Sequence, residues 1–230
     1  MLGFGFSAKP CPHDYRIVEQ ADLCEALVSH LNLQEFHVLA HDYGDTVAQE
    51  MLARQNMQQG AGRWLSCLFL NGGLFPETHN ALLVQRLLLG RLGFLVRHAF
   101  SKASMRKSFD RVFGPDTPTS DEELNAFWDL FTLDNGQRNL HRLIHYMTDR
   151  RINRERWLLA LQQACCPIGL INGSVDPVSG EHMVARFEEL VGGEHFIRRL
   201  PAIGHYPQVE SPLEVQAYYL EFLAAMEPAG

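Results

Sequence analysis

One stretch of the sequence, residues 40–44 (AHDYG), constrains the fold more than any other. An apolar run at residues 36–40 leads into it, and residues 45–59 continue with apolar side chains at helical spacing. Small residues at both ends of the pentapeptide permit a tight turn that pushes the side chain of Asp42 outward. A strand, a sharp turn and a helix are the context that presents a nucleophile at the end of a parallel strand. The alternative interpretation is that Asp42 only caps the following helix.

An aspartate at this position selects the chemistry that the turn can support. Attack of a carboxylate on an ester carbonyl gives an anhydride, which is uphill, whereas attack on a saturated carbon opens an epoxide or displaces a halide. The result is a covalent alkyl ester on the enzyme, which water activated by a histidine would cleave. The N-terminus of the helix after Asp42 would favour its negative charge.

Composition narrows the class of protein. The 230 residues are 46% hydrophobic, enough for the core of one large domain or of a domain with an insertion. A formal net charge of −7 excludes nucleic acid as a general partner. Five cysteines without a C-x-x-C pair indicate free thiols in a reducing, cytoplasmic compartment, and we expect neither a metal nor a cofactor.

No segment is typical of a membrane span or of a secretory signal. The first residues contain neither a basic region nor an apolar one. The longest apolar run, residues 81–100, is interrupted by arginines and is typical of an amphipathic helix. We expect this helix to pack over a core or an active site, or else to contact lipid or a lipophilic substrate.

The order of patterns predicts an α/β fold with a mostly parallel sheet. Strands are expected at residues 36–41, a buried strand, and at 65–70, 167–172 and 195–200, and helices at 23–31, 43–59, 181–190 and 213–226. Residues 75–161 lack a convincing strand pattern and contain helical patterns separated by turns. We interpret them as a helical cap inserted between two parts of the core, residues 1–74 and 162–230.

Two further residues stand where a parallel sheet places its sites, directly after a strand. Asp176 follows the strand at 167–172, and His205 follows the strand at 195–200. Taken singly, each is also typical of an ordinary loop. Asp42, Asp176 and His205 nevertheless occur in the order nucleophile, acid, base. We predict that His205 activates water and that Asp176 holds its tautomer.

The chain resembles the epoxide hydrolase and haloalkane dehalogenase branch of the α/β-hydrolases, and in particular the hydrolases of the mesoderm-specific transcript type. The matching segments are residues 3–7 (GFGFS), 9–10 (KP), 41–45 (HDYGD), 47–50 (VAQE), 71–73 (NGG), 75–79 (FPETH), 113–115 (FGP), 156–157 (RW), 176–178 (DPV) and 205–208 (HYPQ). The resemblance implies the triad Asp42, Asp176 and His205 and a cap over the pocket. It fixes the fold better than the reaction, because the substrate of this subgroup is not settled.

Some positions depart from that branch. Dehalogenases usually place a tryptophan after the nucleophile to hold the departing halide, whereas this chain has Tyr43, which keeps its backbone N–H but offers no indole donor. Epoxide hydrolases usually use two cap tyrosines to protonate the epoxide oxygen, and Tyr146 is the only tyrosine of the predicted cap. It lies in a helical stretch, residues 140–148, and faces either the core or the pocket. Tyr206 is a second candidate donor. His41, beside the nucleophile, is interpreted as a structural residue or a pocket wall.

A larger departure concerns the start of the chain. Members of the family begin upstream with the first strands and a His-Gly-x-Pro loop that supplies half of the oxyanion hole, and that motif does not occur here. About four strands are expected where the resemblance implies eight, so we expect either a fragment of a longer reading frame or a reduced protein. The backbone N–H of Tyr43 would be the remaining oxyanion donor, and loss of one such donor costs roughly 10²–10³ in rate. The strand before Asp42 would present an apolar edge, through which we expect a homo-oligomer.

Three functions remain open from the sequence. The first is hydrolysis of a small lipophilic epoxide, or of an alkyl halide, through a covalent ester on Asp42. The second is an esterase or lactonase, for which Asp42 would have to act as a base because no Gly-x-Ser-x-Gly motif occurs. The third is a catalytically weak binding protein on the same fold.

Overall fold

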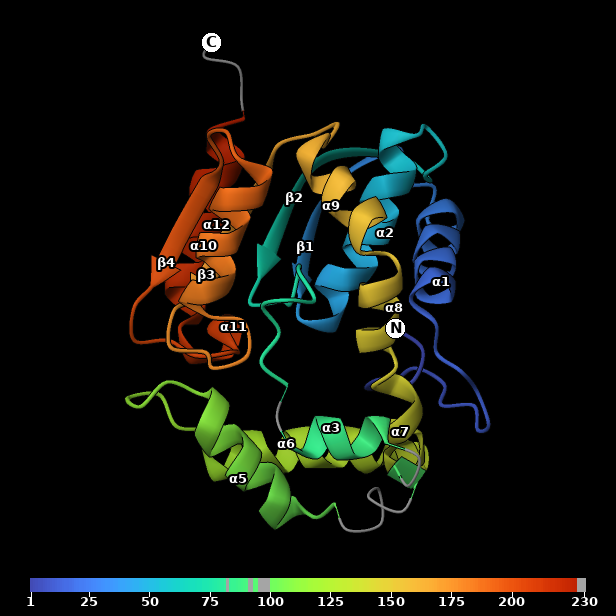
Figure 1. Cartoon of the computed structure of the whole chain (residues 1–230), viewed down its shortest axis with the longest axis vertical. Coiled ribbons are helices and arrows are strands. Elements are labelled where there is room, and N and C mark those ends of the chain that lie inside the picture. The colour runs from blue at the N-terminus through green and yellow to red at the C-terminus, as the bar shows by residue number, and fades with distance from the viewer. Residues whose placement is uncertain (82, 91–92, 95–99, 227–230) are drawn as a thin grey trace.

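The computed structural model describes residues 1–81, 83–90, 93–94 and 100–226. Its four strands form one parallel sheet in the order β1-β2-β3-β4 (Figure 1). The strands are β1 (Glu35–His41), β2 (Arg63–Leu70), β3 (Ile168–Gly173) and β4 (Phe196–Leu200). The predicted fold class, α/β with a parallel sheet, is confirmed, and each strand lies within two residues of its predicted bounds.

Helices cover both faces of the sheet. They are α1 (Ile17–His30), α2 (Tyr43–Asn56), α9 (Arg154–Gln162), α10 (Glu181–Val191), the short α11 (Pro207–Glu210) and α12 (Pro212–Ala224). Because neighbouring side chains of a strand point to opposite faces, Phe69 and Leu170 belong to one core cluster with α2, α9 and α10. Leu70 and Ile171 belong to another core cluster, with Phe222 of α12.

Strand β1 corrects one prediction. Central strands of a parallel sheet are buried on both faces, and β3 is buried along its whole length. β1 instead lies at the edge of the sheet and alternates between half-buried and exposed residues, so the prediction of a buried strand at residues 36–41 is wrong. The exposed residues of β1 are Glu35, His37 and Leu39, of which Leu39 is apolar and 46% exposed, so an association through this edge stays a prediction.

Between β2 and β3 the described part of the chain is helical or irregular. Its elements before α9 are α3 (Leu83–Leu89), α5 (Lys102–Val112), α6 (Asp121–Thr132), the 3₁₀ helix η1 (Leu133–Asn139), α7 (Leu140–Leu143) and α8 (Tyr146–Ile152). Helices α3, α5, α6 and α7 lie together beyond the carboxyl ends of the strands (Figure 1). Helix α9 instead packs on α2, beside the sheet. The division of the chain at residues 75 and 161 into core and cap stays a prediction.

The predicted amphipathic helix at residues 81–100 is only partly described. Helix α3 covers Leu83–Leu89, whereas residues 82, 91–92 and 95–99 lie outside the described residues. Within the described part of the chain, no helix combines the length and the apolar character that crossing a bilayer requires.

The exposed β1 edge leads to the first testable prediction. We expect the chain to associate through β1 at micromolar concentration, because unpaired backbone groups and Leu39 lie along this edge. Size-exclusion chromatography with light scattering should give a dimer, which Leu39→Lys should convert to a monomer. Leu220→Lys, at an exposed residue of α12, is the matched control. A monomeric unmodified chain would contradict the prediction.

Candidate active site

The first site residue, Asp42, occupies the sharp turn between β1 and α2. Its φ of 49° and ψ of −107° are rare for a residue with a side chain. Such strain persists only where the surroundings enforce it, and it is concentrated at functional sites. The N–H of Asp42 donates to the carbonyl of Leu70 at 3.3 Å, which ties the turn to the end of β2. The turn leaves 36% of the Asp42 side chain exposed, so a substrate can reach the carboxylate.

His205 lies between the two predicted carboxylates. Its Nδ1–H donates to Oδ2 of Asp176 at 2.8 Å, and its Nε2 lies 3.7 Å from Oδ2 of Asp42. Asp42 follows β1, Asp176 follows β3 and His205 follows β4, so all three lie at the carboxyl ends of parallel strands. The structure thus brings together the three residues that the sequence proposes as a triad, with nucleophile, base and orienting acid in the required order of contact.

Two residues that hold Asp176 were not predicted. Oδ2 of Asp176 accepts from the hydroxyl of Ser179 at 2.8 Å and from the amide of Asn71 at 3.2 Å, while Oδ1 accepts from the N–H of Val178 at 2.8 Å. The Asn71 amide also bonds both the N–H and the carbonyl of Gly173. The position of Asn71, directly after the strand β2, is a sequence feature from which it could have been predicted. No comparable feature of the sequence points to Ser179.

Charge at the site is distributed unequally. Burial opposes ionisation of Asp42, but the nearby charges of His205 and Arg150 hold its pKa below the usual range. Burial likewise opposes the charge of His205, but Asp176 and Asp42 raise the pKa of its imidazole to about 10. The resting site is therefore an imidazolium between two carboxylates. Nearby Asp45, which is fully buried, has a pKa well above its usual range because of burial and of the charge of Asp42.

His41 holds the main chain of His205, the predicted base. Its Nε2–H donates to the main-chain carbonyl of His205 at 2.7 Å, and its ring lines the cavity in front of Asp42. Burial, followed by the charge of His205, lowers the pKa of His41, so His41 is neutral when it makes this bond. These contacts place His41 where a structural residue or a pocket wall would lie.

The candidate proton donors occupy different surroundings. Tyr206 lines the same cavity as Asp42 and stacks on Phe113, with ring centroids 5.1 Å apart. Tyr146, at the start of α8, is buried against Tyr43, and its hydroxyl accepts from the amide of Gln85 at 3.4 Å. Among the described residues that line the cavity, Tyr206 is included and Tyr146 is not. Burial raises the pKa of both phenols, so both keep their protons at neutral pH.

The backbone N–H of Tyr43 remains the candidate oxyanion donor. Tyr43 is the first residue of α2, so no carbonyl within the helix can accept its N–H. The sequence suggests that the tight turn needs a small residue at Gly44. In the structure a Cβ on Gly44 would meet only the end of the Met1 side chain, at 3.3 Å, so the space around this glycine is less restricted than expected.

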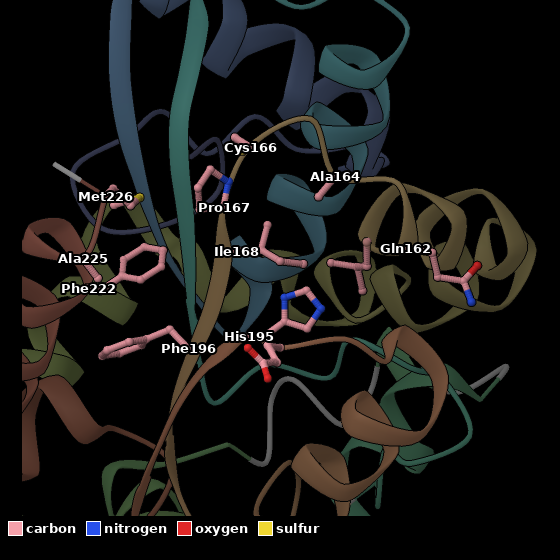
Figure 2. Close-up of a pocket in the computed structure, with 12 residues that line it drawn as sticks. Gln162, Ala164, Cys166, Pro167, Ile168, His195, Phe196, Phe222, Ala225 and Met226 are labelled. Carbon is pink, nitrogen blue, oxygen red and sulfur yellow. The ribbon is translucent and has the colours of Figure 1, made fainter. Parts of the chain in front are cut away.

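The cavity in front of Asp42 has a volume of about 480 Å³ and is mostly apolar. Its walls come from α5, α6, η1 and α7 and include Met105, Phe109, Phe127, Leu130, Phe131, Leu140 and Leu143. A second cavity of about 470 Å³ lies at the opposite end of the sheet, where Ile168 and Phe196 begin β3 and β4 (Figure 2). None of the three predicted site residues lines this second cavity.

The half-buried Glu210 joins the His205 loop to the helical segment, and we call this set of hydrogen bonds the Glu210 clamp. Oε2 of Glu210 accepts from the N–H groups of Gly114 and Gly204, at 2.7 and 2.9 Å, and from the hydroxyl of Thr117 at 2.7 Å. Its Oε1 accepts from the N–H of Tyr206 at 2.9 Å. One carboxylate therefore fixes the loop on both sides of His205, a role that no sequence pattern indicated.

Comparison with known proteins assigns the chain to a family. A model of the alpha/beta hydrolase family matches residues 1–217. The chain belongs to this family. This alpha/beta hydrolase is 39% identical to the mesoderm-specific transcript homolog protein of Bos taurus, over 96% of this chain and 68% of that protein. The predicted resemblance to hydrolases of the mesoderm-specific transcript type is thereby confirmed.

Solved structures place the hydrolase among enzymes of several activities. The epoxide hydrolase CorEH has a TM-score of 0.76 and 17% identity, over 99% of this chain and 81% of that one. An esterase from Thermogutta terrifontis has a TM-score of 0.77 and 19% identity, over 99% of this chain and 79% of that one. At these identities the likeness shows the fold and not the reaction.

The Glu210 clamp generates the second prediction. Glu210→Gln should lower the free energy of unfolding by about 2 kcal/mol, because the carboxylate accepts four hydrogen bonds and the amide offers one acceptor oxygen. That loss corresponds to a midpoint lower by roughly 4–8 °C for a chain of this size. Calorimetry of Glu210→Gln beside Glu214→Gln, an exposed residue of α12, measures it. Equal midpoints for the two variants would contradict the role of Glu210.

Proposed function

We propose that this alpha/beta hydrolase opens small lipophilic epoxides through a covalent ester on Asp42. The observation that carries the proposal is a partly exposed, ionised aspartate on the strained turn, 3.7 Å from an imidazole that a second aspartate orients. The apolar cavity in front of Asp42 supports a lipophilic substrate. Alkyl halides are less favoured, because Tyr43 offers no indole N–H to a departing halide.

The first step is an attack at saturated carbon. A lone pair of the Asp42 carboxylate forms the bond to an epoxide carbon, and the electrons of the broken C–O bond pass to the epoxide oxygen. A phenol supplies the proton to that oxygen. Tyr206, which lines the cavity, is the better placed donor, and Tyr146 is the alternative.

The second step is hydrolysis of the ester. After alkylation the imidazolium of His205 gives its proton to the phenolate. The neutral Nε2 of His205 then takes a proton from water, and the hydroxide adds to the ester carbonyl of Asp42. The resulting oxyanion accepts from the N–H of Tyr43. On collapse the hydroxyl proton of the intermediate passes to the departing alkoxide, which leaves as a diol, and the carboxylate of Asp42 and the imidazolium of His205 are restored. Asp176 stabilises the imidazolium whenever His205 is protonated.

An esterase function is the alternative. The esterase from Thermogutta terrifontis shows that the fold accommodates such enzymes, and here Asp42 would act as a base on water. The two functions differ in the fate of Asp42, because only the epoxide route leaves it alkylated. We also propose a reducing, cytoplasmic location, since the five cysteines are all free thiols in the described chain.

The third prediction concerns covalent trapping with styrene oxide. His205→Gln should accumulate one adduct per chain, located on Asp42 by peptide mass spectrometry, because alkylation proceeds and hydrolysis stops. Asp42→Asn should form no adduct and lose roughly 10⁴-fold or more in turnover. His37→Gln, an exposed histidine of β1, is the matched control and should turn over like the unmodified chain. Hydrolysis of styrene oxide by Asp42→Asn would overturn the proposal. Turnover of p-nitrophenyl butyrate by the unmodified chain, lost in Asp42→Asn and without an adduct on Asp42 in His205→Gln, would favour the esterase alternative.

The fourth prediction separates the two phenols. Tyr206→Phe should slow alkylation of Asp42 by roughly 10²–10⁴-fold, the usual contribution of a positioned acid. Tyr146→Phe should slow it less than tenfold, because Tyr146 does not line the cavity. Single-turnover adduct formation in the His205→Gln background measures both. The reverse order of effects would transfer the role to Tyr146.

A further inference from the structure

A smaller cavity of about 280 Å³ lies beside the Asp42 turn, between the loop after β2 and helices α3 and α8. Three guanidinium groups line it, those of Arg86, Arg150 and Arg151, together with His79. No aspartate or glutamate is among the described residues that line this cavity. Its walls are therefore strongly cationic in a chain whose net charge is −7.

Arg150 is the unusual member of this set, because only 1% of it is exposed. Its Nε–H donates to the hydroxyl of Thr46 at 2.7 Å, and its Nη2 donates to the main-chain carbonyl of Asp42 at 3.4 Å. Its Nη1 donates to Nδ1 of His79 at 3.3 Å, and its Cζ lies 4.6 Å from the ring centroid of Tyr146.

None of these partners is a carboxylate, and within the described part of the chain no carboxylate forms a salt bridge with Arg150. A buried cation without a contacting anion is costly. His79 adds no charge at neutral pH, because burial and Arg150 lower its pKa to about 4.

The loop after β2 is shaped to admit this guanidinium. A Cβ on Gly73 would overlap Nη1 of Arg150 and crowd His79, so the guanidinium keeps its present position only with glycine there. The segments at residues 71–73 and 75–79, which the resemblance singles out, thus leave the space in which Arg150 lies.

The neighbouring groove provides a contrast. There Glu77 pairs with Arg154 and with Arg186, so the protein itself supplies their counter-charge, and Arg151 lies between this groove and the smaller cavity. In the smaller cavity the corresponding negative charge is missing from the described walls.

We propose that the cavity lined by Arg86, Arg150 and Arg151 is a binding site for a small oxyanion, a carboxylate or a phosphate. Planar guanidinium groups bind both oxyanions through paired hydrogen bonds. Two sources share this chemistry, a separate small anion and a carboxylate carried by a larger apolar molecule that reaches toward Asp42.

The test is calorimetric titration of the whole chain with inorganic phosphate and with acetate at constant ionic strength, without any turnover. Since Arg150 is buried, its replacement would disturb the packing, and the variants are Arg86→Gln and Arg151→Gln, both exposed. Each should weaken binding roughly tenfold, the effect of one charged hydrogen bond. Arg154→Gln removes a charge from the neighbouring groove and is the matched control. No saturable binding of either anion, or equal weakening by the control, would overturn the proposal.

A second titration, with 3-phenylpropionate, distinguishes the sources. Binding tighter than that of acetate, and weakened by Phe127→Ala in the apolar cavity, would assign the site to a carboxylate on a larger molecule. Binding equal to that of acetate would assign it to a separate anion. Either outcome supports the site only if Arg151→Gln also weakens the binding of 3-phenylpropionate. Repeating the titrations in Asp42→Asn separates this proposal from the proposed function, since anion binding should survive loss of the nucleophile.

Discussion

The contact of one imidazole with two carboxylates is the constraint on which the rest of the site depends. His205 reaches Asp176 at 2.8 Å and Asp42 at 3.7 Å, and these three residues belong to loops that follow different strands. Their approach requires the parallel register of the sheet, the amide of Asn71 across β2 and β3, and the Glu210 carboxylate that fixes the loop. The amide of Asn71 thus holds the loop that carries Asp176, and the carboxylate of Glu210 holds the loop that carries His205.

The sequence predicted the positions of the reacting groups and failed on their supports, for a physical reason. Asp42, Asp176 and His205 follow strands, and a strand end is readable from local patterns. Asn71, Ser179, Glu210 and Arg150 act through tertiary contacts, such as that between Arg150 and Thr46, which lie 104 residues apart. The error at β1 has the same origin, because an apolar run does not reveal whether a strand has neighbours on both sides. The place of Tyr206 in the apolar cavity likewise depends on helices that only the fold positions.

The distribution of charge around Asp42 also follows from the fold. Arg150 donates to the carbonyl of Asp42 and, together with His205, favours the ionised carboxylate. Asp45, one turn into α2, is driven by burial and by Asp42 toward the neutral form. Two acids on the same turn thus differ in ionisation, and the exposed one carries the negative charge. This is the arrangement that a nucleophilic carboxylate needs, because a second ionised acid beside it would raise its pKa.

Under the proposed mechanism, the same charges explain how one histidine serves both steps. In the resting site the two carboxylates raise the pKa of His205 to about 10, so the imidazole is protonated and cannot act as a base. Alkylation turns Asp42 into a neutral ester and removes one of these charges. The pKa of His205 must then fall toward the value that burial and Asp176 alone permit. His205 then gives its proton to the phenolate that is left after the phenol has protonated the epoxide oxygen. The neutral imidazole is then ready to activate water. The base is therefore generated by the covalent step itself, at the moment when an ester exists to be hydrolysed.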